Sequence, residues 1–569
     1  MSWDQTYLLF GHGLGFSVLL AALPIFTLLF LLGVMRKAAW IAGLSGLAVT
    51  FVIAIGAYHM PPVVAISAAA NGAAFGLFPI SWIVFWAIVL FRVTVETGQF
   101  EIIKDSIGRL TSDPRLQALL IAFAFGGFLE GAAGFGTPVA IAATMLIGLG
   151  FSPFSASAIC LLANTAPVAF GSIGIPIITL AGTTGLPLDK LSAAVGHICA
   201  PISFFLPAYL IIAMGGFASL SGIVVPTLLA GFSFAVVQFS ISVYVGPQLA
   251  DIMAALAAMS SLVLYLRFCH AKKGDEEVAI GAYAGMGISS GPGARFARLG
   301  AIEEIDPTPG VEQRVLSRHT IGSILYAWMP YGLLVICVLL WGWVPLQTIL
   351  NRFTVLLSWP FLDDVVRRMP PIVAVATPYH AVFSLNWLSA SGTACMIATL
   401  LSAICLRMKL RDFTKVLIGV MRQLYLPTVT VTSVLAIAFL MNYCGATATL
   451  GLGFSATGAM FPFFSALLGW VGVFLTGSDT SANALFGNLQ VVTANHLGFD
   501  PILMAAANSA GGVMGKMISL QTIAIAAAAT DLSQPDQAKL FRFTLKHSIL
   551  LASIVGCAVL LYTYVLHFN

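Results

Sequence analysis

The sequence predicts an all-α polytopic membrane protein, and three observations support this fold class. The chain has 569 residues, of which 59% are hydrophobic and only 8% are charged. Its mean hydropathy is +0.98, whereas a soluble domain carries about a quarter charged residues. The apolar residues form long continuous runs, and a related pattern of small and charged residues interrupts them in each half of the chain. Lipid is therefore the expected solvent of most of the chain.

Continuous apolar runs predict helices, because an outer-membrane barrel would show short strands of alternating polarity. A helix needs about 20 mostly apolar residues to cross a bilayer, which gives about 12–14 membrane segments here. Two stretches, 116–182 and 459–530, are apolar but broken by glycine, proline and polar residues. The clear runs are Gly15–Met35, Ala39–Tyr58, Ile80–Phe91, Ile198–Met214, Ile223–Val245, Asp251–Leu266, Tyr326–Val344, Trp387–Leu406, Val416–Met441 and His547–Leu566.

One long polar segment, 267–318, separates a first membrane half, 1–266, from a second, 319–569. It contains seven basic and seven acidic residues, and its central part is rich in Gly, Ala and Ser. Such a composition buries too little apolar surface to form a core of its own. The segment is therefore predicted to be a linker loop, with a regulatory role as the alternative.

The two halves share three short motifs in the same order, which predicts two structural repeats. The loop before the first copy carries Lys104, Arg109 and Arg115, whereas residues 442–470 before the second contain no Lys or Arg. Since basic loops face the cytoplasm, the copies are predicted to be inverted. The motifs are G-x-F-L-x-G at Gly126–Gly131 and Gly472–Gly477, L-G-F-x-P at Leu149–Pro153 and Leu497–Pro501, and A-N-[ST]-A at Ala163–Ala166 and Ala507–Ala510.

Each copy contains a segment that breaks the helical pattern. In the first, Gly131–Pro138 holds three glycines and a proline, so one helix should end near Glu130 and another begin near Pro138, with Thr137 as its N-cap. In the second, the small polar residues of Thr476–Asn483 should start a new half-helix. Broken or re-entrant backbone is tolerated in a membrane only inside protein or along a cavity. Further breaks are predicted at Asn164–Pro167, at its counterpart Asn508–Gly512, and at Asn442–Thr447.

Three ionisable residues, Glu130, Asp479 and Lys516, lie in these otherwise apolar segments. A charge at the bilayer centre costs about 3 kcal/mol on insertion scales, so each is expected to be paired, neutralised or functional. Lys516 is expected to pair with Asp479 or Glu130, and an ion pair that only locks helices is the alternative. Free N–H groups at half-helix N-termini attract anions. The residues thus predict a site for a small anion between the two copies.

These motifs resemble the signature of a known family, the bacterial lactate permeases, and the resemblance runs nearly end to end. It implies secondary active uptake of L-lactate, D-lactate or glycolate by proton symport across the bacterial inner membrane, with no cofactor besides the proton. Ser519–Ile523 departs from the pattern of relatives, which concerns only the helix geometry after Lys516. The matching stretches are Gly127–Ala140, Ala163–Gly171, Thr476–Ser481, Gly515–Ser519, Thr97–Phe100 and Phe541–Thr544.

The resemblance also suggests roles for the candidate residues. Lys516 and the half-helix N-termini are expected to bind the substrate carboxylate, and either Asp479 or Glu130 is expected to carry the proton. If Asp479 pairs with Lys516 in the empty protein, its protonation would free the lysine for the anion; Glu130 could play the same part. Further candidates for binding the carboxylate and the 2-hydroxyl group are Ser478, Thr480, Asn164, Asn508 and Thr137.

Several alternatives stay open at this stage. A sodium-coupled carboxylate or anion transporter would show a similar architecture, and so would a passive anion channel. An integral membrane enzyme is disfavoured because no nucleophile with a paired base is evident, and no phosphate-binding GxxxxGK[ST] motif indicates ATP coupling. The eight cysteines form no CxxC motif or Cys/His cluster, so no metal site is predicted. The expected partners are the lipid bilayer and a small carboxylate, and nucleic acid is not among them.

Overall fold

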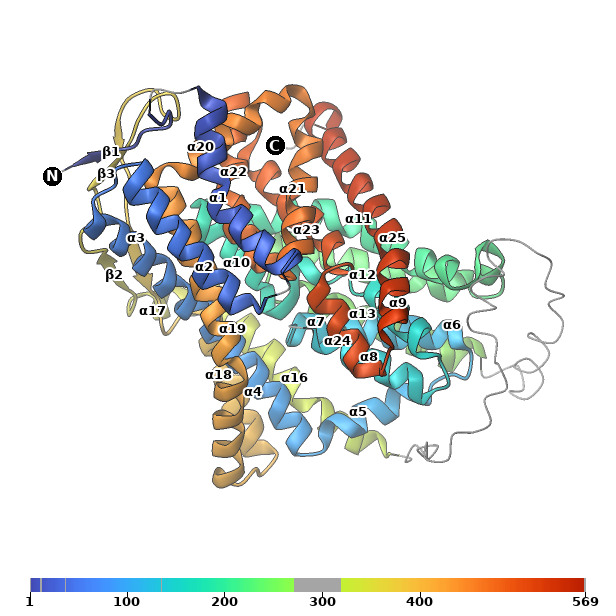
Figure 1. Cartoon of the computed structure of the whole chain (residues 1–569). Coiled ribbons are helices and arrows are strands. Elements are labelled where there is room, and N and C mark those ends of the chain that lie inside the picture. Colours follow the sequence, from blue (N-terminus) through green and yellow to red (C-terminus); the bar gives the residue numbers. More distant parts are fainter. Residues whose placement is uncertain (1, 11–12, 36, 135, 271–318, 567–569) are drawn as a thin grey trace.

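The computed structural model of the protein describes residues 2–10, 13–35, 37–134, 136–270 and 319–566 (Figure 1). Within these ranges, 12 helices are long and apolar enough to cross a bilayer, or 13 if the bent pair Pro153–Ala163 and Val168–Thr184 is one span. The predicted all-α class with 12–14 membrane segments is therefore confirmed. Of the predicted linker, residues 271–318 lie outside the described residues, and Leu266–His270 forms a π-helical turn. The division into two halves at this linker stays a prediction.

The first half, blue to green in Figure 1, contains apolar spans in which a π-helical turn joins two helices. π-helical turns at Gly76–Ser81 and Ala118–Phe125 join α3 to α4 and α6 to α7. The helices are α1 (Leu14–Gly33), α2 (Ala39–Val52), α3 (Pro62–Phe75), α4 (Trp82–Glu96), α5 (Gln99–Gly108), α6 (Pro114–Gln117), α7 (Gly126–Ala132), α8 (Thr137–Gly148), α9 (Pro153–Ala163), α10 (Gly171–Thr184), α11 (Leu188–Gly215), α12 (Val224–Tyr244) and α13 (Ala250–Tyr265).

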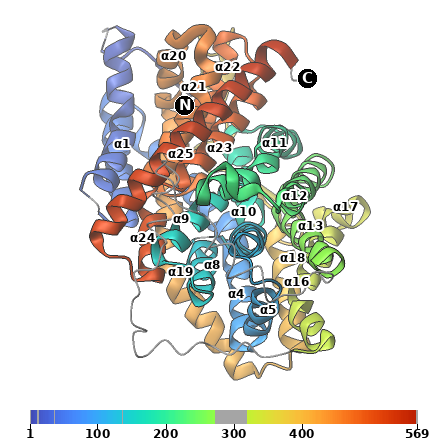
Figure 2. The ribbon, with the colours of Figure 1, turned by 90° about the vertical axis from the view of Figure 1, so that its right-hand side faces the viewer.

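The second half, yellow to red, interlocks with the first. Its helix α19 packs against α2, α3 and α4, while α24 contacts α8, and α25 crosses beside α21, α23 and α9 (Figure 2). The helices are α16 (Ile321–Gly342), α17 (Val344–Asn351), α18 (Ser391–Cys405), α19 (Leu410–Cys444), α20 (Ala446–Phe454), α21 (Phe461–Thr476), α22 (Asp479–Leu497), α23 (Pro501–Lys516), α24 (Leu520–Thr530) and α25 (Gln534–Leu561).

Burial separates the central spans from those that face lipid. In the apolar window of Pro114–Ala132, which ends with α7, 94% of the residues are buried, compared with 28% for α1 and for the α25 span. The exposed side chains of α1 are large and apolar, as a lipid-facing helix requires. The span that carries Glu130 therefore lies in the centre of the protein.

The L-G-F-x-P motif folds into the same local structure in both halves. A glycine with positive φ follows α8 and α22, at Gly150 (φ 98) and Gly498 (φ 76). Ser152 then caps α9 by accepting a hydrogen bond from the Ser155 N–H, and Asp500 caps α23 by accepting one from the Ile502 N–H. Each cap is followed by a proline in the first helical turn, where its missing N–H is not needed.

Five short strands in the described residues form a small cap beside the N-terminus (Figure 1), which the sequence analysis did not anticipate. The segment between α17 and α18 contains four prolines, which exclude a long helix. Arg367 binds Asp4 through two hydrogen bonds of 2.7 and 2.8 Å. One sheet has β1 (Trp3–Asp4) parallel to β3 (Val366–Arg368), which pairs antiparallel with β4 (Thr377–Pro378); the other pairs β2 (Val355–Ser358) antiparallel with β5 (Val382–Leu385).

The predicted break at Asn508–Gly512 is wrong, because α23 runs through it without interruption. Its glycines serve close packing against α21 instead. A Cβ atom at Gly511 would lie 2.0 Å from the backbone oxygen of Ala466, and one at Gly515 would lie 2.4 Å from that of Trp470. Gly511 and Gly515 form a G-x-x-x-G pair, the pattern that lets membrane helices approach each other closely. The breaks predicted at Asn164–Pro167 and Asn442–Thr447 are confirmed.

Replacing Gly469 by alanine is expected to destabilise the protein, because the new Cβ would lie 1.8 Å from the backbone oxygen of Asn508. Overpacking of this kind typically costs about 1–3 kcal/mol, and here only a backbone shift could relieve it. The matched control is Gly332→Ala in α16, where a Cβ meets nothing within 4 Å. Thermal unfolding in detergent should show a clearly lower midpoint for Gly469→Ala alone; equal midpoints would contradict the close α21–α23 contact.

Candidate functional site

The broken segments of both halves line one cavity with a volume of about 350 Å³. Its walls come mainly from the starts of α2 and α10, from α4 and α7, from the middle of α19, and from the α21–α22 and α23–α24 junctions. Pockets that enclose small ligands begin at about this size. Five of the predicted residues line this cavity: Glu130, Ser478, Asp479, Thr480 and Lys516.

Lys516 and Glu130 form an ion pair between the two halves. Lys516 Nζ donates a hydrogen bond of 2.6 Å to Glu130 Oε1, and the two side chains are 12% and 3% exposed. Glu130 Oε2 also accepts a bond of 3.3 Å from Asn164 Nδ2. Lys516 is the last residue of α23, where the helix dipole favours a cation. Of the two partners predicted for Lys516, the structure therefore selects Glu130.

Room for the Glu130 carboxylate comes from Gly171, at the break before α10. A Cβ atom at this position would lie 2.8 Å from Glu130 Oε1. The following residues Ser172, Ile173 and Gly174 all have positive φ values, of 48°, 60° and 75°, so the chain turns sharply there. Ser172 lines the cavity and donates a hydrogen bond to the Ala133 oxygen in the break after α7. The two breaks of the first half thus support each other.

Asp479, the first residue of α22, is 3% exposed and is held by neutral groups. Its Oδ2 accepts hydrogen bonds from Ser509 Oγ at 2.7 Å and from Asn483 Nδ2 at 3.2 Å. Its Oδ1 has no hydrogen-bond partner among the described residues. Gly512 makes room for it, because a Cβ there would lie 2.5 Å from Asp479 Oδ1. In each half, therefore, a glycine later in the chain makes room for a buried carboxylate: Gly171 for Glu130, and Gly512 for Asp479.

The predicted half-helix start in the second copy is confirmed, and α22 begins at the cavity wall. Ser478 is its N-cap, with Oγ accepting from the Ser481 N–H at 3.3 Å. Gly477 ends α21 with a positive φ of 73°. The first turn of α22 therefore directs backbone N–H groups, which carry partial positive charge, toward the side of the cavity where Ser478, Asp479 and Thr480 lie.

A sequence profile of the L-lactate permease family matches residues 17–566 of the chain. The chain belongs to this family. It is 42% identical to an L-lactate permease of Bacillus subtilis (strain 168), with 98% of this chain and 97% of that protein aligned. It is 41% identical to the glycolate permease GlcA of Escherichia coli (strain K12), with 99% of each aligned. It is 40% identical to an L-lactate permease of the same organism, with 99% and 98% aligned.

Membership of the L-lactate permease family confirms the resemblance drawn from the motifs. The protein is a permease, and thus a transporter rather than an enzyme. With its membrane-length helices, it is a multi-pass integral membrane protein, which in bacteria resides in the inner membrane. The central cavity is lined by both halves of the chain, and substrate sites of secondary transporters commonly lie between such halves.

Two predicted residues, Asn164 and Asn508, are not among the residues that line the cavity, and the side chain of a third, Thr137, is not described. Asn164 contacts Glu130 rather than the cavity. Asn508 is fully buried behind the site, where its Nδ2 donates to Asn483 Oδ1 at 2.9 Å. Thr137 is the first residue of α8, and the preceding Gly136 takes the N-cap position, so the predicted N-cap is off by one residue. The Thr137 side chain is outside the described part, and direct substrate contacts of all three stay predictions.

The sequence analysis missed several polar residues at this site of the L-lactate permease fold. Gln423, Thr476 and Gln521 line the cavity; Gln423 belonged to no motif, and Thr476 and Gln521 lay in named segments but were assigned no role. Asp251 was interpreted as the start of an apolar run. It is 1% exposed and its Oδ1 accepts a hydrogen bond of 2.9 Å from Gln238 Nε2. A Cβ at Gly131, the neighbour of Glu130, would lie 3.1 Å from the Asp251 Cβ, which places a third buried carboxylate behind α7.

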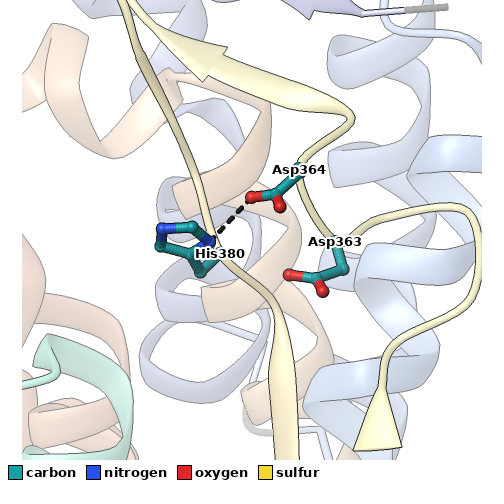
Figure 3. Close-up of side chains that lie close together, drawn as sticks. All are labelled: Asp363, Asp364 and His380. Carbon is teal, nitrogen blue, oxygen red and sulfur yellow. Dashed lines mark ion pairs between the residues drawn. The ribbon is translucent and has the colours of Figure 1, made fainter.

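A second cluster of ionisable side chains, Asp363, Asp364 and His380, lies in the strand cap and not at the cavity (Figure 3). The possible ligand atoms lie within 4.8 Å of one another. His380 Nδ1 contacts Asp364 Oδ1 at 2.7 Å, with the side chains 74% and 56% exposed. Asp363 Oδ1 accepts a hydrogen bond from the Ala381 N–H. These contacts join two chain segments of the cap, and exposed ion pairs of this kind stabilise by at most about 1 kcal/mol.

Proposed function

We propose that the protein takes up L-lactate, and also D-lactate and glycolate, by proton symport across the inner membrane. The observation that supports this most strongly is the Lys516–Glu130 ion pair at the wall of a cavity shared by both halves. The relatives with 40–42% identity are permeases for L-lactate and for glycolate. A 2-hydroxy monocarboxylate offers one negative charge and a neighbouring hydroxyl group, which match one cation and a set of small polar groups.

In this proposal Lys516 binds the substrate carboxylate, because it is the cation that lines the cavity among the described residues. The N-terminus of α22 adds partial positive charge from the other side of the site. The hydroxyl groups of Ser478 and Thr480 lie on the same wall and are proposed to bind the carboxylate or the 2-hydroxyl group. Hydrogen bonds to neutral groups are weaker than those to charged groups, which suits a substrate that must also be released.

Proton coupling follows from competition for Lys516. While Glu130 is ionised, it holds the lysine at 2.6 Å. Protonation of Glu130 removes the opposite charge and leaves Lys516 available for the substrate anion. By linkage, anion binding then favours protonation of Glu130 to the same extent. Asp479 is the second candidate for the proton, because no cation contacts its carboxylate among the described residues.

We further infer that the two broken segments are inverted repeats that move relative to each other around this site. The shared cap structure of the L-G-F-x-P motif and the paired glycine–carboxylate contacts support the relation between the copies. The absence of Lys and Arg from residues 442–470 supports opposite orientations. Such repeats allow one site to open to either side of the membrane in turn.

Reconstituted protein should accumulate labelled L-lactate in liposomes when the outer pH is lower than the inner pH. Without any gradient, uptake should stop at the external concentration. Accumulation driven by a sodium gradient alone would instead support a sodium-coupled transporter. Uptake that never exceeds the external level under any gradient would support a passive channel, and no lactate uptake at all would contradict the proposed function.

A further inference from the structure

A second cavity, of about 770 Å³, lies at the ends of α4, α18 and α19. Four basic side chains line it against two acidic ones, Glu96 and Asp412. Asp412 is bound by Lys415 at 2.9 Å. The described ion pairs include none with the remaining basic residues, so the cavity carries uncompensated positive charge. These residues are Arg92, Arg407 and Lys409.

Gln423 joins this basic cavity to the central one, because it lines both. Arg92 on α4 donates a hydrogen bond of 3.0 Å to the Gln423 Oε1 on α19. The i, i+4 spacing of Arg92 and Glu96 favours an ion pair within α4, yet the structure shows Arg92 bound across to α19. Beyond Gln423, α19 continues along the central cavity with Leu424, Pro427 and Thr430 among others. The Arg92–Gln423 bond therefore lies at the junction of the two cavities.

We propose that the basic cavity is a vestibule through which the carboxylate substrate passes, and that Arg92 is a transient anion-binding residue at its inner end. This inference rests on the proposed lactate transport. A cleft with net positive charge raises the local concentration of anions. The guanidinium group of arginine binds a carboxylate through two parallel hydrogen bonds, which an amide partner cannot match. An arriving anion therefore displaces Gln423 from Arg92 and opens the junction.

The basic residues of this cavity also indicate on which side of the membrane it opens. Arg407, Lys409, Arg411 and Lys415 form a basic loop and helix start, which the positive-inside rule places in the cytoplasm. The vestibule is then the cytoplasmic opening of the path. The competing interpretation is that these residues serve only to orient the chain in the membrane. The two interpretations differ in one measurable property, which is the dependence of transport on salt at this side.

The test uses inside-out membrane vesicles, whose outer face is the cytoplasmic one, and measures the initial rate of lactate entry below saturation. In the wild type, raising the outer ionic strength from about 0.01 to 0.15 M shortens the screening length from about 30 to 8 Å and should slow entry severalfold. In Arg407→Gln/Lys409→Gln, entry at low salt should fall about three- to tenfold, and its salt dependence should flatten. Arg411 and Lys415 keep the orientation signal in this variant. Arg352→Gln, an exposed charge of the strand cap, is the matched control.

Arg92 is tested in the same vesicles with two substitutions. Arg92→Gln should lower the entry rate at every salt concentration, and Arg92→Lys, which keeps the charge without the fork, should recover part of it. Unchanged salt dependence in the double variant, together with wild-type rates for Arg92→Gln, would overturn the vestibule. An equal effect of salt on lactate entry into right-side-out vesicles, whose outer face is the periplasmic one, would overturn the vestibule as well. Absence of lactate transport in the wild type would instead remove the proposed function.

Discussion

Replacing Lys516 by alanine is expected to raise the dissociation constant for lactate by about thirtyfold or more. Removing one partner of a buried, hydrogen-bonded charge pair costs about 2–5 kcal/mol, and each 1.4 kcal/mol is a factor of ten in affinity. Lys516 is 12% exposed and already bridges the two halves, so its charge is held where an anion would bind. Isothermal titration or competition with labelled lactate on purified protein measures the change.

Two controls separate the loss of binding from the loss of fold. Lys539→Ala removes an exposed lysine that pairs with Asp536 at 2.9 Å and should leave affinity unchanged. Lys516→Ala/Glu130→Gln removes the carboxylate that the first substitution leaves buried without its cation, so it should restore stability without restoring affinity. Lactate affinity within a few-fold of wild type in Lys516→Ala would remove this residue from the site.

Backbone features of this protein could be predicted from the sequence wherever they depend on nearby residues. Gly131–Pro138 cannot continue a helix whatever surrounds it, and α7 does end at Ala132. Ser478 and Asp500 cap helices because their side chains reach an N–H two or three residues ahead. Asn508–Gly512 was misinterpreted for the opposite reason. Glycines permit both a break and a close helix contact, and only the neighbouring helix α21 decides between them.

For contacts between residues far apart in the chain, the sequence could reduce the candidate partners to a few but could not select one. Glu130 and Lys516 are 386 residues apart, and Asp479 is nearer to Lys516 in sequence, yet the lysine binds Glu130. The choice depends on how α7 and α23 lie against each other, which no local pattern encodes. Asp251 and Gln423 were missed for the same reason. Each belongs to no motif, and its significance comes from Gln238 or Arg92 on another helix.

The two candidate proton carriers, Glu130 and Asp479, differ in how their protonation would affect Lys516. In the proposed mechanism, protonating Glu130 removes the charge that holds the lysine, so the gain of a proton and the gain of an anion site are one event. Protonating Asp479 first affects its hydrogen bonds to Ser509 and Asn483, which are neutral groups. The geometry therefore supports Glu130 as the coupling residue and Asp479 as a positioning residue of the α22 N-terminus.

Glu130→Gln is accordingly expected to uncouple lactate transport from the proton gradient. Glutamine keeps the shape of the side chain and an oxygen for Asn164 or Lys516, but it neither gains nor loses a proton. Lys516 would then stay available to the anion at any pH. Exchange of labelled for unlabelled lactate should persist at a rate within about tenfold of wild type, whereas a proton gradient should no longer drive accumulation. Both quantities are measured in the same proteoliposome preparation.

Asp479→Asn in parallel decides between the two carboxylates. If Glu130 carries the proton, Asp479→Asn should still accumulate lactate under a proton gradient, with any defect appearing in the Michaelis constant. Loss of accumulation with exchange intact in Asp479→Asn, and full accumulation in Glu130→Gln, would reverse the assignment. Asp536→Asn, at a partly exposed position of α25, is the matched control for removing a carboxylate. Exchange needs substrate binding and the conformational change but no net proton transfer. The ratio of accumulation to exchange therefore separates a defect in proton coupling from a defect in binding or in the conformational change.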